Sequence, residues 1–357
     1  MKRIIFISIA LLSGLLYWFS SDNRFMLKLY AKRIHLDSPF GSDREYYGDL
    51  YSFCYLPQFK INDPILKNIQ PDTIKNIKRD INLYTICDSY LFNFIKTDLI
   101  FHGVKRYWFC KSGGTNSPLV KMDTTQKNIL IIESTERFVR NMANADAFTK
   151  LLQPVASTGF ADTTATDFKK TPAISFPVLA MIFNPRISQT LEFNLFDYKF
   201  FSPLKEWKAA LNYNLFNRAN KEVKISPDGK HLFLVETVDS TSTFSSFKRT
   251  DDKDIDYIVA SLNKIYAHYK ALGFDEVYLS MIPNPVTIIA PEMGNYNHLI
   301  SRIQENPDLK MPYIDMYKKF KATKENIYQP TDTHWNNRGF KLWVDEFNKT
   351  LAVAYPR

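Results

Sequence analysis

The residues best suited to chemistry lie far apart in the sequence, at Ser89 and at Asp332 with His334. A serine hydroxyl becomes an effective nucleophile when a histidine removes its proton and a carboxylate holds that histidine in the correct tautomer. In an extended loop Asp332 and His334 point to one side while Thr333 points to the other. The three residues therefore predict nucleophilic acyl chemistry, although an Asp-x-His before a helix is also common in ordinary capping loops.

Ser89 stands at a predicted junction between a strand, residues 82–87, and a helix-like run that starts with Tyr90. In open parallel sheets the active groups collect at the carboxyl ends of the strands. A serine on such a turn presents its hydroxyl above the sheet, and its own N–H is the first candidate donor to an oxyanion. The alternative is that Asp88 or Ser89 only caps the helix.

The elements that must position these residues follow from apolar runs that alternate with helical patterns. Buried strands are predicted at 82–87, 129–134 and 276–282, and amphipathic helices at 254–273 and from about 338 onward. Strand and helix in alternation favour an α/β fold with a mostly parallel sheet and helices on both faces. A β-hairpin is predicted about Asp228-Gly229. Residues 150–220, rich in Phe, Pro and Thr, are expected to form an insertion or lid.

The composition is that of a folded globular protein of 357 residues, with 45% hydrophobic and 23% charged residues. The net charge of +9 is spread along the chain without a clustered basic run, so we expect no nucleic-acid partner and only mild attraction to anionic polymers or membrane surfaces. Cys54, Cys87 and Cys110 have apolar neighbours typical of buried packing positions. No Cys or His spacing predicts a metal site.

The N-terminus combines Lys2 and Arg3 with an uncharged apolar run, residues 4–19. This pattern is typical of an export signal. Bulky residues near the end of the run argue against cleavage, so we expect residues 1–22 to be an uncleaved, single-pass signal anchor with the rest of the chain in the periplasm or outside the cell. Cleavage would instead give a secreted protein.

Five segments together resemble the SGNH hydrolase-like family of the alginate O-acetylation proteins AlgX and AlgJ. They are CDSY (87–90), ILIIESTERF (129–138), SPDGKHLFL (226–234), LSMIPNP (279–285) and DTHW (332–335). The similarity covers most of residues 80–345. It implies an SGNH-hydrolase-like (flavodoxin-like) domain at 51–357, which follows the anchor and a connector at 23–50.

The resemblance also implies roles for individual residues. Ser89 would be the nucleophile, His334 the general base and acid, and Asp332 its orienting carboxylate. The candidates for oxyanion or substrate contacts are Asp88, Tyr90, Asn116, Glu136, Arg137 and Trp335. Tyr90 and Trp335 equally suit packing, and Asn116 equally suits a loop turn. No metal or organic cofactor is implied.

The chain departs from the family at three places. The serine motif precedes DTHW, Cys87 stands where the family has glycine, and Asn284-Pro285 stands near the place of an expected lysine. A side chain at position 87 is expected to crowd the oxyanion pocket or to require different backbone angles.

The function expected from the resemblance is an extracytoplasmic O-acetyltransferase or carbohydrate esterase acting on a cell-surface or secreted polysaccharide. A transferase would take its acyl groups from a membrane-bound O-acyltransferase partner. Two alternatives stay open: a catalytically inactive polysaccharide-binding or scaffold protein of an exopolysaccharide secretion system, which Cys87 favours, and a lipid or peptidoglycan esterase.

Overall fold

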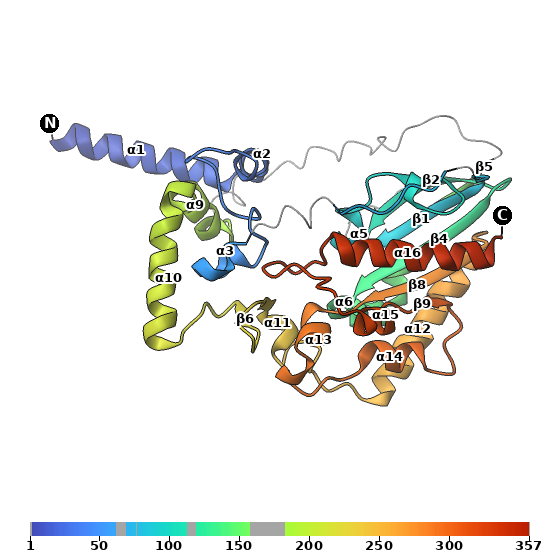
Figure 1. Cartoon of the computed structure of the whole chain (residues 1–357). Coiled ribbons are helices and arrows are strands. Elements are labelled where there is room, and N and C mark those ends of the chain that lie inside the picture. Colours follow the sequence, from blue (N-terminus) through green and yellow to red (C-terminus); the bar gives the residue numbers. More distant parts are fainter. Residues whose placement is uncertain (1, 62–68, 76, 113–118, 158–182, 357) are drawn as a thin grey trace. The chain divides into compact units, whose positions relative to one another are not determined.

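A computed structural model of the chain describes residues 2–61, 69–75, 77–112, 119–157 and 183–356 (Figure 1). The chain divides into two compact units: unit 1 is Met1–Asn62 with Lys169–Val223, and unit 2 is Asp63–Phe168 with Lys224–Arg357. The predicted connector at 23–50 and much of the predicted insertion at 150–220 thus belong to one unit. Residues 51–62, which we expected in the hydrolase-like domain, also belong to unit 1.

Unit 2 is a mixed α/β structure built on a five-stranded parallel sheet. The strands are β1 (Ile81–Cys87), β2 (Val104–Lys111), β4 (Lys127–Thr135), β8 (Glu276–Ile282) and β9 (Tyr313–Ile314). Their order is β2-β1-β4-β8-β9, and all neighbours are parallel. Counted along the chain this is order 2-1-3-4-5, as in doubly wound sheets of the flavodoxin-like class. The predicted parallel α/β architecture is therefore confirmed.

Helices flank this sheet and two small sheets accompany it (Figure 1). The helices are α5 (Ser89–Phe92), α6 (Glu136–Val139), α7 (Ala145–Thr149), α11 (Val235–Val238), α12 (Asp252–Ala271), α13 (Pro285–Ile289), α14 (Leu299–Gln304), α15 (Met316–Ala322) and α16 (Asn337–Ala354), with 3₁₀ turns η2 (Asp98–Ile100), η3 (Arg140–Ala143) and η5 (Pro291–Met293). Strand β3 (Leu119–Asp123) pairs with β5 (Gln153–Ser157). Strand β6 (Val223–Ile225) pairs with β7 (Leu232–Leu234) around the predicted turn, where Gly229 has φ +72°.

Each face of the central sheet packs against its own group of helices, because side chains alternate between faces along a strand. Leu130 and Ile132 of β4 join a core with Leu262 of α12. Ile129 and Ile131 join the opposite core with Trp343 of α16. The predicted inward faces of both long helices are buried, apart from Tyr266, which is partly buried. The amphipathic patterns therefore indicate the correct buried face of each helix.

Trp343 gives a direct test of this packing. Its side chain is fully buried, and its indole N–H donates to the Ser280 hydroxyl at 2.9 Å. We expect Trp343→Ala to lower the free energy of unfolding by about 3–5 kcal/mol, since it leaves a large cavity and an unpaired hydroxyl. Denaturant titration of the full chain in detergent, followed by far-UV circular dichroism, measures this loss. Tyr257→Ala, at a residue 65% exposed on α12, should change it by less than about 0.5 kcal/mol.

The described residues of unit 1 form helices and turns, apart from Val223, where β6 begins. The helices and turns are α1 (Lys2–Ser21), α2 (Asn23–Ile34), α3 (Tyr51–Cys54), η1 (Pro57–Phe59), α9 (Ile187–Phe196), η4 (Lys199–Phe201) and α10 (Ser202–Phe216). Among the described helices, α1 alone is long and apolar enough to cross a membrane. The two chain segments of the unit are joined through Arg33 of α2, whose guanidinium donates to the Phe193 carbonyl at 2.8 Å and lies over the Tyr198 ring at 4.0 Å.

Candidate active site

Ser89 lies at the point of the sheet where the strand order reverses. It is the first residue of α5, directly after β1, and β1 lies between β2 and β4. The connections from β1 and β4 leave on different sides of the sheet at such a point, which opens a crevice above their carboxyl ends. The local sequence therefore delivers the serine hydroxyl to the place where doubly wound folds bind ligands.

The structure brings together the three residues that the sequence predicts as a catalytic unit. The Ser89 Oγ lies 2.7 Å from His334 Nε2, and His334 Nδ1 lies 2.6 Å from Asp332 Oδ1. Asp332 Oδ1 also accepts the His334 backbone N–H at 2.9 Å. The His334 and Asp332 side chains are 17% and 15% exposed, so substrate can reach a site that is otherwise largely shielded from water.

The contacts of His334 determine which ring nitrogen carries the proton. An ionised carboxylate only accepts hydrogen bonds, so Nδ1 must donate to Asp332 when the imidazole is neutral. Nε2 is then the acceptor and can take the Ser89 proton. This is the arrangement that general-base activation of a serine requires.

The loop that carries His334 is held on both sides by main-chain contacts. Tyr328 and Trp335 form an antiparallel bridge, and the Gln329 N–H donates to the His334 carbonyl at 3.2 Å. Strand β7 joins the same loop, where the Leu232 N–H donates to the Pro330 carbonyl at 2.7 Å. These main-chain contacts hold the loop in place, while Asp332 and Ser89 contact the ring nitrogens.

The residues that follow His334 explain the rest of the motif. Asn336 caps α16 by accepting the N–H groups of Arg338 and Gly339. A Cβ on Gly339 would lie 2.5 Å from the Ile327 carbonyl oxygen and 2.8 Å from the Trp335 Cβ. Glycine is therefore required where the helix meets the loop, and Trp335 is fully buried beneath it.

Asp88 fixes the turn that presents Ser89. One carboxylate oxygen accepts the Tyr90 N–H at 2.8 Å, and the other accepts the Thr135 N–H at 3.0 Å and its hydroxyl at 2.9 Å. The Asp88 N–H in turn donates to Glu133 Oε2 at 2.9 Å. Asp88, a candidate for substrate or oxyanion contact, is thus occupied in joining the end of β1 to the end of β4.

Glu133 is a buried carboxyl beneath this turn that the sequence analysis did not single out. It is fully buried in β4. Burial, and then the neighbouring Asp88 carboxylate, raises the pKa of Glu133 well above its usual range. The folded protein therefore holds a proton on Glu133 at pH values where the unfolded chain has released it.

This difference predicts a pH-dependent stability. The unfolded chain releases the Glu133 proton near a pKa of about 4.3. Above that pH the folded state holds one more proton than the unfolded state, so the free energy of unfolding of the wild type falls as pH rises, by at most about 1.4 kcal/mol per pH unit. We expect Glu133→Gln, which keeps the acceptor for the Asp88 N–H, to gain stability relative to wild type between pH 5 and pH 8. Urea titration followed by tryptophan fluorescence measures this, with the exposed Glu292→Gln as the matched control. A wild-type-to-variant difference that is constant with pH would contradict it.

Cys87 does not occupy the space above the turn. Its side chain is fully buried in the apolar cluster that includes Leu83 and Ile131, and its φ is not positive. Burial raises the pKa of the Cys87 thiol, so the group stays neutral. The expectation that this side chain crowds the site, or demands unusual backbone angles, is therefore wrong. All three cysteines are free and buried, as predicted.

Glu136 and Arg137 lie just past the end of β4. Glu136 is 1% exposed, and its Oε2 accepts the Asn284 N–H at 2.9 Å and the Thr287 hydroxyl at 2.6 Å. It therefore anchors the start of α13, and its burial leaves it unsuited to the substrate contact we considered. The Arg137 guanidinium lies 4.9 Å from the centre of the Phe138 ring, and its charge acts on Glu133.

The remaining candidates divide into packing residues and one residue outside the described ranges. Tyr90 is buried, donates its hydroxyl to the Thr333 carbonyl and lies 4.9 Å from the His334 ring centre. Tyr90 and Trp335 thus support the histidine loop from below and do not face substrate. Asn116 lies outside the described residues. The last described residue before it, Ser112, lies beside the active turn, where its N–H donates to the Cys87 carbonyl at 2.9 Å.

Sequence reasoning missed Glu133, Thr135 and Gly339 as parts of the site. Glu133 had a readable signal: a carboxylate inside an otherwise aliphatic strand needs a buried partner. Thr135 and Gly339 gave none, because their roles depend on contacts with segments distant in sequence.

Comparison with family models, with curated proteins and with solved structures found no match for this chain.

Proposed function

We propose that this protein is a membrane-anchored, serine-dependent O-acyl transferase or esterase that acts on acetyl groups of a cell-surface or secreted polysaccharide. The observation that carries the proposal is the continuous set of contacts from Asp332 through His334 to the Ser89 hydroxyl. Its location at the switch point of a 2-1-3-4-5 sheet and the resemblance of the five motifs support an SGNH-hydrolase-like arrangement.

The reaction proceeds in two halves. Ser89 Oγ attacks the ester carbonyl while His334 Nε2 takes the hydroxyl proton, and His334 then gives that proton to the departing alcohol. This leaves an acetyl group on Ser89. A sugar hydroxyl or water next gives its proton to Nε2 and attacks the acetyl-serine, and the proton returns to Ser89. Asp332 stabilises the imidazolium that forms in each half.

The oxyanion in each half needs hydrogen-bond donors. The Ser89 N–H opens α5, and the first N–H groups of a helix have no acceptor within the helix. We therefore assign it as the first donor. Asn116, which lies outside the described residues, is the candidate for a second donor.

The membrane location rests on α1. Its apolar residues follow Lys2 and Arg3, which favours an orientation with unit 2 outside the cytoplasm. Ser20 and Ser21 at its end are buried in unit 1, and the Asn194 amide donates to the Ser20 hydroxyl at 2.7 Å. Because these contacts make α1 part of a folded unit, they support a retained anchor. A membrane-bound O-acyltransferase partner would supply acyl groups on the outer side.

The test uses the full chain in lipid nanodiscs with a chromogenic acetyl ester. We expect release of the chromophore and an acetyl group on the peptide that contains Ser89, found by mass spectrometry after acid quench. A deacetylated polysaccharide added to the reaction distinguishes the two activities: a transferase acetylates the polymer, whereas an esterase yields only acetate.

The proposal fails if the folded protein gives neither turnover nor labelling of Ser89 by a fluorophosphonate. Binding of the polysaccharide without any turnover would then favour the inactive binding or scaffold alternative. Turnover of lipid esters in preference to acetylated polysaccharide would favour the lipid esterase.

A further inference from the structure

Helix α10 in unit 1 turns its apolar side outward. Leu204, Trp207, Leu211 and Leu215, which we call the α10 apolar face, follow each other at intervals of three or four residues and so share one side of the helix. All four are exposed, Trp207 by 64% and Leu215 by 68%. A surface helix of a soluble protein shows the reverse pattern, with its apolar side toward the core.

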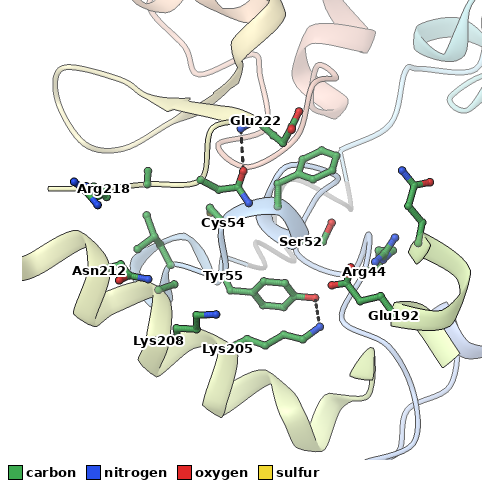
Figure 2. Close-up of a pocket in the computed structure, with 16 residues that line it drawn as sticks. Arg44, Ser52, Cys54, Tyr55, Glu192, Lys205, Lys208, Asn212, Arg218 and Glu222 are labelled. Atoms are coloured by element: carbon green, nitrogen blue, oxygen red, sulfur yellow. Dashed lines mark hydrogen bonds between the residues drawn. The ribbon is translucent and has the colours of Figure 1, made fainter. Parts of the chain in front are cut away.

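The polar side of the same helix is turned toward unit 1. Glu206 Oε1 accepts the Tyr51 hydroxyl and the Lys60 ammonium, both at 2.7 Å. Figure 2 shows Lys205 lying beside Tyr55 in a pocket of about 1,050 Å³, and its Nζ is 3.2 Å from the Tyr55 hydroxyl. Polar groups thus hold α10 in place and leave its apolar face uncovered. Contiguous apolar surface of this kind indicates a partner or a membrane.

The apolar face lies close in the chain to the candidate membrane helix. Helix α9 contacts α1 (Figure 1), and Asn194 of α9 bonds Ser20 at the end of α1. Only residues 197–201 separate α9 from α10. Phe200 among them, and Phe196 at the end of α9, are also exposed. A bilayer crossed by α1 is therefore within reach of α10.

The charge of unit 1 fits the same partner. Unit 1 contains 16 of the 46 Lys and Arg residues of the chain but 9 of the 37 Asp and Glu residues. Seven of the nine net positive charges thus belong to this smaller unit, and five of them remain when Lys2 and Arg3, at the far end of α1, are left out. Cationic segments beside an apolar helix face are attracted to anionic lipid headgroups.

We propose that α10 is an interfacial helix that lies in the boundary between headgroups and acyl chains of the membrane that α1 crosses. Its apolar face enters the acyl region, Lys205 stays on the aqueous side, and the exposed Lys208, at the edge of that face, extends its ammonium to the headgroups. This proposal does not depend on chemistry at Ser89. It gives unit 1 two attachments to one bilayer, of which α1 is the first.

The first test places a nitroxide at Leu211→Cys in the full chain, in nanodiscs of neutral and anionic phospholipid that hold one protein each. Tyr257→Cys, on the exposed side of α12, is the matched control, and the buried native cysteines are checked with labelled wild type. We expect the nitroxide at position 211 to collide more often with oxygen than with a water-soluble nickel complex. The nitroxide at position 257 should show the reverse. An equal ratio of oxygen to nickel collisions at positions 211 and 257 overturns the proposal.

The second test needs no new cysteine. Phospholipids brominated near the headgroup quench tryptophans at the interface, so wild type should show a quenched component that Trp207→Phe loses. Trp18 of α1 remains in both proteins and reports on the anchor. Quenching that is unchanged by Trp207→Phe overturns the proposal. A face protected from both collision reagents without lipid quenching would instead show that protein covers it, which also overturns the proposal.

Discussion

Ser89→Ala is expected to lower turnover of an acetyl ester by about 10⁴- to 10⁶-fold, because alanine has no hydroxyl to attack the carbonyl or to carry the acetyl group. The Ser89 hydroxyl contacts His334, while the turn itself is held by the Asp88 carboxylate and Glu133. The variant should therefore fold as wild type does. Steady-state release of the chromophore by the full chain, with circular dichroism as the check on folding, measures the loss.

Three further proteins make that result specific. Ser301→Ala removes a hydroxyl that donates to the His298 carbonyl, away from the site, and should keep wild-type turnover. His334→Ala should lose about as much as Ser89→Ala, and the double variant little more, because residues that act as one unit are not additive. Turnover by Ser89→Ala within tenfold of wild type would place the nucleophile elsewhere.

The strands with a strong apolar pattern were predictable, and the sheet edges were not. Predominantly apolar runs marked β1, β4 and β8, which have neighbours on both sides. Strand β9 has only two residues, and β2 carries exposed Lys105 and Lys111, so neither has the periodicity of a buried strand. Their pairing depends on the completed sheet.

The candidate site was predictable where chemistry restricts the residue types. Ser89, Asp332 and His334 could be named because few types of side chain can serve as a nucleophile, a base or an orienting carboxylate. The support beneath them was only partly predictable: Glu133 stands inside an aliphatic strand, which is a signal, whereas Glu136 differs from a surface glutamate only in burial. Glu136 was a candidate for either a structural or a substrate contact, and its bonds to Asn284 and Thr287 favour the structural one.

Unit 1 escaped prediction for a different reason. Its two segments are separated by more than 100 residues, and the contacts that join them, such as Arg33 with the Phe193 carbonyl, link one side chain to distant main chain. The charge excess also looked evenly spread until the segments were grouped. Nor could the sequence reveal that the apolar side of helix α10 faces outward.

Asp332→Asn is expected to lower turnover by about 10²- to 10⁴-fold with little change in KM. The amide oxygen can still accept the His334 backbone N–H, so the loop should keep its position. In the place of Oδ1 that oxygen also still accepts from Nδ1, but the amide carries no charge to stabilise the imidazolium that forms during the reaction. The loss should therefore appear in kcat, because the negative charge matters most when the imidazolium forms.

Asp315→Asn is the matched control for this change. Asp315 caps α15 by accepting the Lys318 N–H, a role that asparagine fills equally well, so turnover should be unchanged. Fluorophosphonate labelling of Ser89 separates the possible causes, because it also needs an activated serine but no polysaccharide. If Asp332→Asn labels at the wild-type rate while KM rises, Asp332 binds substrate and does not orient His334. If labelling and kcat fall together, the carboxylate acts through the histidine, as its 2.6 Å contact with Nδ1 indicates.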